Sequence, residues 1–248
     1  MKGYIEDKEF GRIYVELRRG MTSVRFTYHA DGSLLMRAPI GVTVADLQRM
    51  VDSNRERLQD LPRPQSATFQ FGQEITGFRC RILIEPTNPR PGYLKTEWDD
   101  DNILHVTMHE STNLTDFSAQ QYISNRISEA MGYVANKELL PYARQVAEAL
   151  GLHPAGFEIG RGMRKLGHCT AKKVIQLSRN LMFLPEPLVR YVICHELAHI
   201  THMNHSPQFH ALCNQYTGGH EKELEKQLRQ FHFPILKMQH IDYQLFIC

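Results

Sequence analysis

Residues 191–210 read YVICHELAHITHMNHSPQFH, and this stretch decides how the chain is interpreted. Within it, His195, Glu196 and His199 form an HExxH motif. On an α-helix, positions i and i+4 share one face, so both imidazoles can reach one ion while Glu196 points beside them. This arrangement is typical of a zinc site in which the glutamate faces a reactive water molecule.

The motif falls on a helix that the surrounding residues predict by themselves. Apolar residues recur at helical spacing from near Pro185 to about Met203. The small Ala198 lies inside the motif, and the flanking residues are apolar. We therefore favour a metal site over the alternative of two surface histidines on either side of a solvated glutamate.

A catalytic zinc ion needs a third protein ligand and an open position. His202 shares the face of His195, but it lies roughly 10 Å farther along the helix axis at about 1.5 Å per residue. Ligands of one zinc ion lie only about 3 to 4 Å apart. The chain must therefore reverse after His199, and Met203 and Asn204 are a suitable place because asparagine tolerates the left-handed conformation that ends helices.

His205 is the first histidine that can return to the site, and we predict it as the third ligand. His210, His220 and an acidic residue such as Glu223 remain alternatives. For His202 and His210, packing beside the site is expected rather than ligation.

The order of elements predicts an α+β fold class with two domains, residues 1–115 and 116–248. The first is expected to be an antiparallel sheet unit with strands in 12–40 and 67–110 and a helix in 42–61, for which Thr43 is a suitable N-cap. The second is expected to be mostly helical, with a small sheet. Its helices are expected at 116–135, 141–150, 185–203, 208–216 and 221–231, and its strands at 157–161 and 174–177. No internal repeat is apparent.

Composition places the chain among ordinary folded proteins, with 42% apolar and 23% charged residues. Lysine and arginine total 29 against 27 acidic residues, so neither nucleic acid nor a membrane is an expected partner. The start of the sequence lacks a signal peptide's apolar core. The five widely spaced cysteines predict no disulfide framework. A cytoplasmic location is expected; the oligomeric state is not indicated.

The stretch HELAHITHMNHSPQF resembles the YgjP-like zinc metallopeptidase family, which is related to the SprT-like and WLM peptidases. The family pattern is HELAH, a short spacer, then NHS and an aromatic residue. A Gly-x-Cys signature precedes the helix and is present here as Gly167, His168 and Cys169, and RAPIGVT at 37–43 resembles the family's N-terminal half. The resemblance therefore covers nearly the whole chain.

The resemblance implies a zincin-like (minigluzincin) second domain. It also implies Zn²⁺ bound by His195, His199 and His205, with Glu196 as general base. The chain departs from the family at Leu166, where tryptophan is usual, and at His168, where serine is usual. These two departures concern substrate contacts in that loop rather than the metal. The spacing of the histidines also equals that of metzincins, but His202 replaces their glycine.

The expected activity is that of a zinc-dependent metallopeptidase acting on a peptide or protein substrate. Glu196 would take a proton from the attacking water and pass it to the leaving amine. The strand at 174–177 is expected to bind an extended peptide at its edge. Candidates for stabilising the oxyanion are His168, Tyr216 and His220.

Two other functions remain open. The first is a zinc-dependent hydrolase of a non-peptide substrate, which the same ligands would support. The second is a regulatory or binding protein that retains the metal site.

Overall fold

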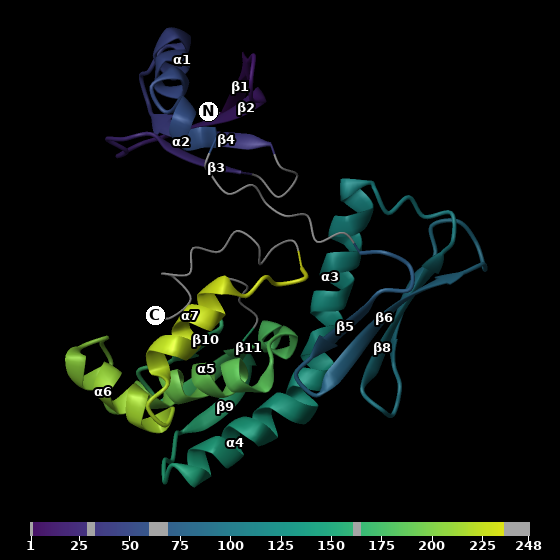
Figure 1. Ribbon diagram of the computed structural model, residues 1–248, viewed down its shortest axis with the longest axis vertical. Helices are drawn as coiled ribbons and strands as arrows, with labels where there is room; N and C mark the ends of the chain where they lie inside the picture. Colours follow the sequence, from purple (N-terminus) through teal and green to yellow (C-terminus); the bar gives the residue numbers. More distant parts are fainter. Residues whose placement is uncertain (1, 29–32, 60–68, 161–164, 236–248) are drawn as a thin grey trace. The chain divides into compact units, whose positions relative to one another are not determined.

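The computed structural model describes residues 2–28, 33–59, 69–160 and 165–235 of the 248-residue chain. Contacts divide the chain into two compact units, Met1–Ser66 and Ala67–Cys248 (Figure 1). Both units combine helices with small sheets, which confirms a mixed α+β fold. Within the part of the chain that the structure describes, no helix has the length and apolar character needed to cross a membrane.

The first unit is a four-stranded sheet followed by two short helices. Its elements are β1 (Lys2–Asp7), β2 (Gly11–Arg18), β3 (Arg25–Tyr28), β4 (Leu34–Pro39), α1 (Val44–Asp52) and α2 (Arg55–Gln59). The strand order is β1-β2-β4-β3. Inward-facing residues of β2 and β4 pack with Leu47 and Val51 of α1 in one apolar cluster. Thr43 is the N-cap of α1, as expected, and forms a capping box with Asp46.

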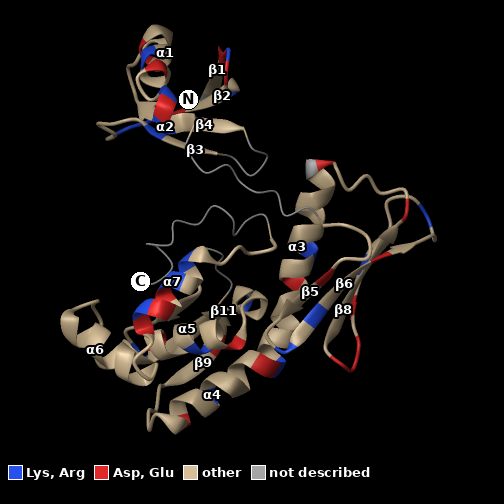
Figure 2. Ribbon diagram, viewed as in Figure 1, with Lys and Arg blue, Asp and Glu red and all other residues tan. Residues whose placement is uncertain are grey.

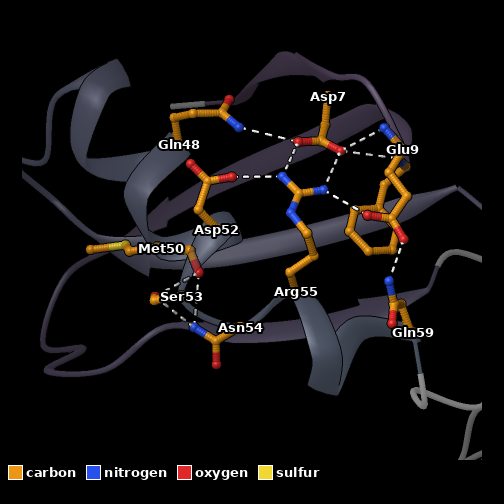
Figure 3. A network of polar contacts seen from close by, with 10 residues as sticks. Asp7, Glu9, Gln48, Met50, Asp52, Ser53, Asn54, Arg55 and Gln59 are labelled. Carbon is orange, nitrogen blue, oxygen red and sulfur yellow. Dashed lines mark hydrogen bonds and ion pairs between the residues drawn. The ribbon is translucent and has the colours of Figure 1, made fainter.

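A buried ion pair ties the turn between β1 and β2 to α2 (Figure 3). The Asp7 side chain is only 2% exposed, and it accepts hydrogen bonds from both terminal nitrogens of Arg55, at 3.3 and 3.0 Å. The Arg55 guanidinium also donates to Glu9 and Asp52. Its hydrogen bonds to Asp7 hold the pKa of that carboxyl well below its ordinary value.

Asp7→Asn is therefore expected to destabilise the first unit at pH 7, by about 1 to 3 kcal/mol. Because the folded-state pKa of Asp7 is lowered, its contribution is present above the unfolded pKa near 3.8 and is lost as pH falls below it. Chemical denaturation at several pH values measures the free energy of unfolding of the variant and of wild type. The difference from wild type should shrink below about pH 4. The control Glu9→Gln removes a more exposed partner of Arg55 and should cost less. A difference that stays constant with pH would contradict the explanation.

The second unit begins with another four-stranded sheet. Its strands are β5 (Glu74–Gly77), β6 (Cys80–Thr87), β7 (Leu94–Trp98) and β8 (Ile103–His109), in the order β5-β6-β8-β7. In both sheets the two central strands are parallel and the outer pairs are antiparallel. The expected antiparallel sheets are thus wrong in their central pairing. Hydrophobic alternation identifies a strand and its inner face, but it does not specify the neighbouring strand.

The two sheets share one strand topology that the sequence did not reveal. Strand order and strand directions are the same in both, and a helix follows each sheet in the chain. The buried positions also correspond, and the central pairs share one register, with Ile13 opposite Leu34 in the first sheet and Ile82 opposite Leu104 in the second. No repeat is apparent in the sequence because the shared feature is an apolar alternation, while most outward-facing residues differ.

The helical part of the second unit follows β8. Its elements are α3 (Phe117–Val134), η1 (Ala135–Leu139), α4 (Leu140–Ala149), β9 (Gly156–Gly160), β10 (Gly167–Cys169), β11 (Val174–Ser178), η2 (Arg179–Phe183), α5 (Glu186–Ala198), α6 (Pro207–Tyr216) and α7 (Glu221–Gln230). Segments α3, η1 and α4 are one continuous helix with a π turn. Pro141 has no N–H to donate to the carbonyl four residues earlier, and the turn before it widens so that the Leu140 N–H bonds the Ala135 carbonyl.

The expected domain boundary near residue 115 differs from the division between residues 66 and 67. One apolar cluster runs from Phe69 to Ile235 and includes β6, β8, α3 and α5. The sheet at 74–109 therefore shares its core with the helices that follow it. Residues 60, 61 and 161, where an expected helix and an expected strand end, lie outside the described residues.

Candidate metal centre

Helix α5 places the HExxH residues in the interior of the second unit. The helix packs against α4, α6, α7 and the strands β10 and β11 (Figure 1). His195, Glu196 and His199 are 3%, 1% and 2% exposed. Buried polar side chains are stable only with partners, so three of them within five residues of one helix indicate a shared site.

The helix ends earlier than expected. Ala198 is its last residue and His199 its C-cap, whereas the sequence placed the end at about Met203. The last bonds of the helix run from the N–H groups of Thr201 and His202 to the Ala198 carbonyl. The reversal that the third ligand requires therefore begins at the second histidine of the motif.

The reversed chain brings His205 beside the two helix histidines. Its Nε2 lies 3.1 Å from His195 Nε2, and its ring centroid lies 4.8 Å from that of His199. One ligand nitrogen from each ring can be chosen so that all three lie within 4.8 Å of one another. Nitrogens bound tetrahedrally to one zinc ion at about 2.0 to 2.1 Å lie about 3 to 3.5 Å apart. The three rings together can hold a metal ion.

The start of α6 fixes the position of His205. Ser206 is the N-cap of this helix, and its hydroxyl accepts a hydrogen bond from the Phe209 N–H. The Phe209 ring packs against all three histidines, with centroid distances of 4.7, 4.5 and 4.8 Å. Phe209 has no role among the residues predicted from the sequence, although an aromatic residue after NHS was the available signal.

The alternative ligands lie elsewhere. His210 bonds the buried Glu221 carboxylate through Nδ1 at 2.7 Å. His220 is exposed at the N-cap of α7, and Glu223 lies in that helix's first turn and bonds Gln227. His202 contributes its carbonyl oxygen, which lies 2.9 Å from His199 Nδ1. That bond orients the ring so that its other nitrogen faces the cluster.

Unpaired buried atoms support a cation at this place. His199 Nε2 and Glu196 Oε2 are both buried and have no hydrogen-bond partner among the described residues. Burial lowers the pKa of all three ring groups, which keeps the imidazoles in the neutral form that binds metals. A divalent cation among the rings would give both unpaired atoms a favourable neighbour, so the residues present fit a bound metal.

Strand β10 lies directly against Glu196. The backbone N–H of Cys169 donates to the Glu196 carboxylate, and a side-chain carbon built on Gly167 would lie only 2.6 Å from Glu196 Cγ. Glycine is thus required here by space. Burial raises the pKa of Glu196 to about 8 in the metal-free site, and a nearby cation would favour its ionised form.

Of the three oxyanion candidates, His168 lies on the strand that contacts Glu196. It belongs to β10, and its charge lowers the pKa of His199. Tyr216 packs against the main core and accepts a hydrogen bond from Cys194 through its carbonyl. His220, at the start of α7, is solvent-exposed.

Comparison with known proteins supports a metal site. A family model described as "YgjP-like, metallopeptidase domain" matches residues 22–231. A curated protein of Escherichia coli (strain K12), named UTP pyrophosphatase, is 37% identical over 65 residues, which is 26% of this chain. The chain matches only 36% of that relative's length. No solved structure matches the chain.

Proposed function

Because the chain belongs to the YgjP-like metallopeptidase family, we propose that it is a zinc-dependent peptidase with a zincin-like site. The observation that carries the proposal is the meeting of His195, His199 and His205 beside the buried carboxylate of Glu196. Three imidazoles favour zinc among the common divalent ions. Zn²⁺ held there would supply a Lewis acid that polarises a carbonyl and makes water more acidic.

Glu196 carries the proton chemistry in this proposal. Its Oε2 atom is buried and has no hydrogen-bond partner among the described residues, so it can accept a proton from the attacking water and pass it to the leaving amine. The Cys169 N–H and the close approach of Gly167 hold the carboxylate in one position. A fixed base beside the reacting atoms is what this mechanism requires.

The substrate strand is expected on β10 and not on the strand first considered. Strand β11 is the central strand, paired with β9 on one side and β10 on the other, so it has no open edge. The expectation of edge addition at 174–177 is therefore wrong. Among the described strands, β10 ends its sheet, and its backbone touches Glu196. An extended peptide added there would place its carbonyl groups beside the cluster.

A second function is supported by the name of the E. coli relative. The same residues could hydrolyse a phosphoanhydride in a nucleoside triphosphate, since a metal site and a fixed base serve that reaction as well. The match covers only about a third of that relative's length. Peptide hydrolysis and phosphoanhydride hydrolysis by this chain are therefore tested side by side.

The test combines elemental analysis with two substrates, unfolded casein and UTP. Wild type is expected to hold about one zinc per chain and to release amino groups from casein. His205→Ala should lose the metal and the activity, because two imidazoles bind zinc far less tightly than three. The control His220→Ala changes an exposed histidine and should retain both.

Release of pyrophosphate from UTP without casein cleavage would replace the peptidase with the second function. Wild-type protein without bound metal, after dialysis against zinc, would contradict both proposals.

A further inference from the structure

An open cavity lies at the edge of the small sheet that is opposite to β10. Its volume is about 500 Å³, and its lining residues come from α4, from the turn after α4 and from the start of β9. Pockets that bind ligands have volumes of roughly 300 to 1,000 Å³. In the strand order β10-β11-β9, the strand β9 lies two strands from β10, about 10 Å at the usual strand spacing. None of the lining residues belongs to the candidate metal centre, so the cavity is a separate site.

The floor of the cavity is apolar. Ala147 of α4 is only 3% exposed, and Leu152 and Phe157 pack against the main core. Pro154 adds a further apolar surface in the turn between α4 and β9. Because the core holds these side chains in place, the cavity is preformed. Removal of its apolar surface from water favours the binding of an apolar group.

The rim of the cavity carries one charge of each sign. Arg144 and Glu148 both line the cavity, and they lie four residues apart on α4, so they share one side of the helix. They are the charged residues of α4, the blue and the red segments of that helix in Figure 2. Within the part of the chain that the structure describes, neither side chain forms an ion pair or a hydrogen bond. Both are therefore available to charged groups of a ligand.

The strand beside the cavity has an open edge. Among the described strands, β9 pairs with β11 alone, so its other side has no strand partner. Every second residue of such an edge directs its N–H and C=O groups away from the sheet. Gly156 and Phe157 both line the cavity, although neighbouring residues of a strand face opposite sides of the sheet. The cavity therefore adjoins the edge itself.

We propose that the edge of β9 binds an extended peptide segment that places a large apolar side chain in the cavity and oppositely charged side chains near Arg144 and Glu148. Pairing along the strand would supply affinity, and the cavity would select the side chain. A small molecule would use the cavity but leave the strand edge unpaired, which is why the geometry favours a peptide. As a docking site for protein substrates, it rests on the proposed peptidase function. Peptide binding itself does not require the metal.

The experiment measures the binding of a fluorescent, end-blocked heptapeptide by anisotropy. The probe has a central phenylalanine with a lysine on one side and a glutamate on the other, and threonine at the remaining positions, because threonine favours extended backbone. The full-length, zinc-loaded Glu196→Gln protein serves as the parent, so that the probe is not cleaved. Saturable binding is expected. Alanine in place of the central phenylalanine of the probe should weaken it about tenfold or more.

Gly156→Val is the variant that blocks the cavity. A side-chain carbon built on Gly156 meets no atom within 4 Å, and the backbone there is not left-handed, so the fold should tolerate the change. The added side chain would occupy part of the cavity and should weaken probe binding about tenfold or more. Gly160→Val is the matched control, because Gly160 lies at the other end of β9 and outside the cavity lining. It should leave the affinity unchanged.

A second variant keeps the test decisive if Gly156→Val lowers Tm. Arg144→Gln combined with Glu148→Gln removes both charges of the rim from an exposed helix surface. The affinity for the probe should fall about threefold, and it should no longer depend on ionic strength. An affinity that stayed as high and as dependent on salt as in the parent protein would overturn the proposal.

The outcomes for the β9 site and for the metal site can be told apart. His205→Ala should lose the metal but bind the probe with the affinity of the parent. Probe binding without casein cleavage would therefore support the β9 site and remove the peptidase function. Casein cleavage without saturable probe binding would overturn the β9 site alone. Equal affinity for the phenylalanine and alanine probes, or unchanged affinity in Gly156→Val, would also overturn it.

A second copy of the chain is the competing occupant of the edge. A dimer in sedimentation that Gly156→Val dissociates, together with no binding of the probe, would replace the peptide by that copy and overturn the proposal. In the active protein, Gly156→Val should raise KM for casein about tenfold and leave kcat unchanged, because docking at β9 does not touch the reacting atoms. A lower kcat at unchanged KM would overturn the role of β9 in substrate docking.

Discussion

Replacing Glu196 by glutamine is expected to leave the zinc content near that of wild type and to lower kcat by about 10²- to 10⁴-fold. Glutamine keeps the size of the side chain but has no basic carboxylate. The ligands on α5 and at His205 are unchanged, so metal binding should persist. Initial rates on casein, or on UTP if that is the substrate, measure the loss, and elemental analysis measures the metal.

The same variant has a second readout that does not depend on activity. Burial raises the folded-state pKa of Glu196 to about 8, above its ordinary value of 4.5. Between these two pH values, the unfolded chain is ionised while the metal-free folded chain resists ionisation, so Glu196 lowers stability increasingly as pH rises. Metal-free Glu196→Gln should therefore have a higher Tm than metal-free wild type at pH 7 to 8.

A matched control is Glu223→Gln, which changes an exposed carboxylate in the first turn of α7. It should leave kcat and Tm nearly unchanged. Full activity of Glu196→Gln would eliminate Glu196 as the base. A lower Tm in the metal-free variant would show that the contacts of the Glu196 carboxylate stabilise the fold by more than the burial of its charge destabilises it.

The local sequence predicts that three histidines meet at the centre of the candidate site. The i and i+4 spacing of His195 and His199 requires only that the segment be helical, and the argument for His205 follows from the length of a helical turn. Both depend on chemistry within a short stretch of chain. The positions found for His195, His199 and His205 agree with this reasoning, although the helix ends five residues before the expected place.

Long-range arrangement was the part that sequence could not provide. The alternating residues of β2 and β6 identify buried strands, but they do not show that each lies beside a parallel partner. The same limitation hid the shared topology of the two sheets. Strand neighbours are determined by which surfaces pack together, and single-strand patterns contain little information about that.

The role of Gly167 was missed for a related reason. A glycine in sequence indicates backbone freedom or close approach, but not which atom approaches. In the structure, the approaching atoms belong to Glu196, which lies 29 residues later in the chain. The glycine has no left-handed backbone, so space alone explains it.

Gly167→Ala is therefore expected to retain zinc and to lose about 10²-fold or more in kcat. The added methyl group would lie 2.6 Å from Glu196 Cγ and 2.7 Å from Cδ, so the carboxylate must move. Displacement of a catalytic group by about 1 Å can cost about 10²-fold in rate. The three atoms nearest the added carbon all belong to Glu196 rather than to a ligand histidine, which is why metal content should not change.

Gly160→Ala is the matched control because Gly160 lies on the other strand that flanks β11. A methyl group there would lie 3.7 Å from Gln176 Cβ, an ordinary contact, so zinc content and kcat should both stay near wild type. The comparison separates the cost of adding a methyl group to this sheet from the cost of displacing Glu196. If Gly167→Ala kept full kcat with unchanged zinc, the reaction would not depend on the position of Glu196, and a base elsewhere in the site would have to be sought. If both variants lost activity and Tm together, the sheet rather than the carboxylate would be the sensitive element.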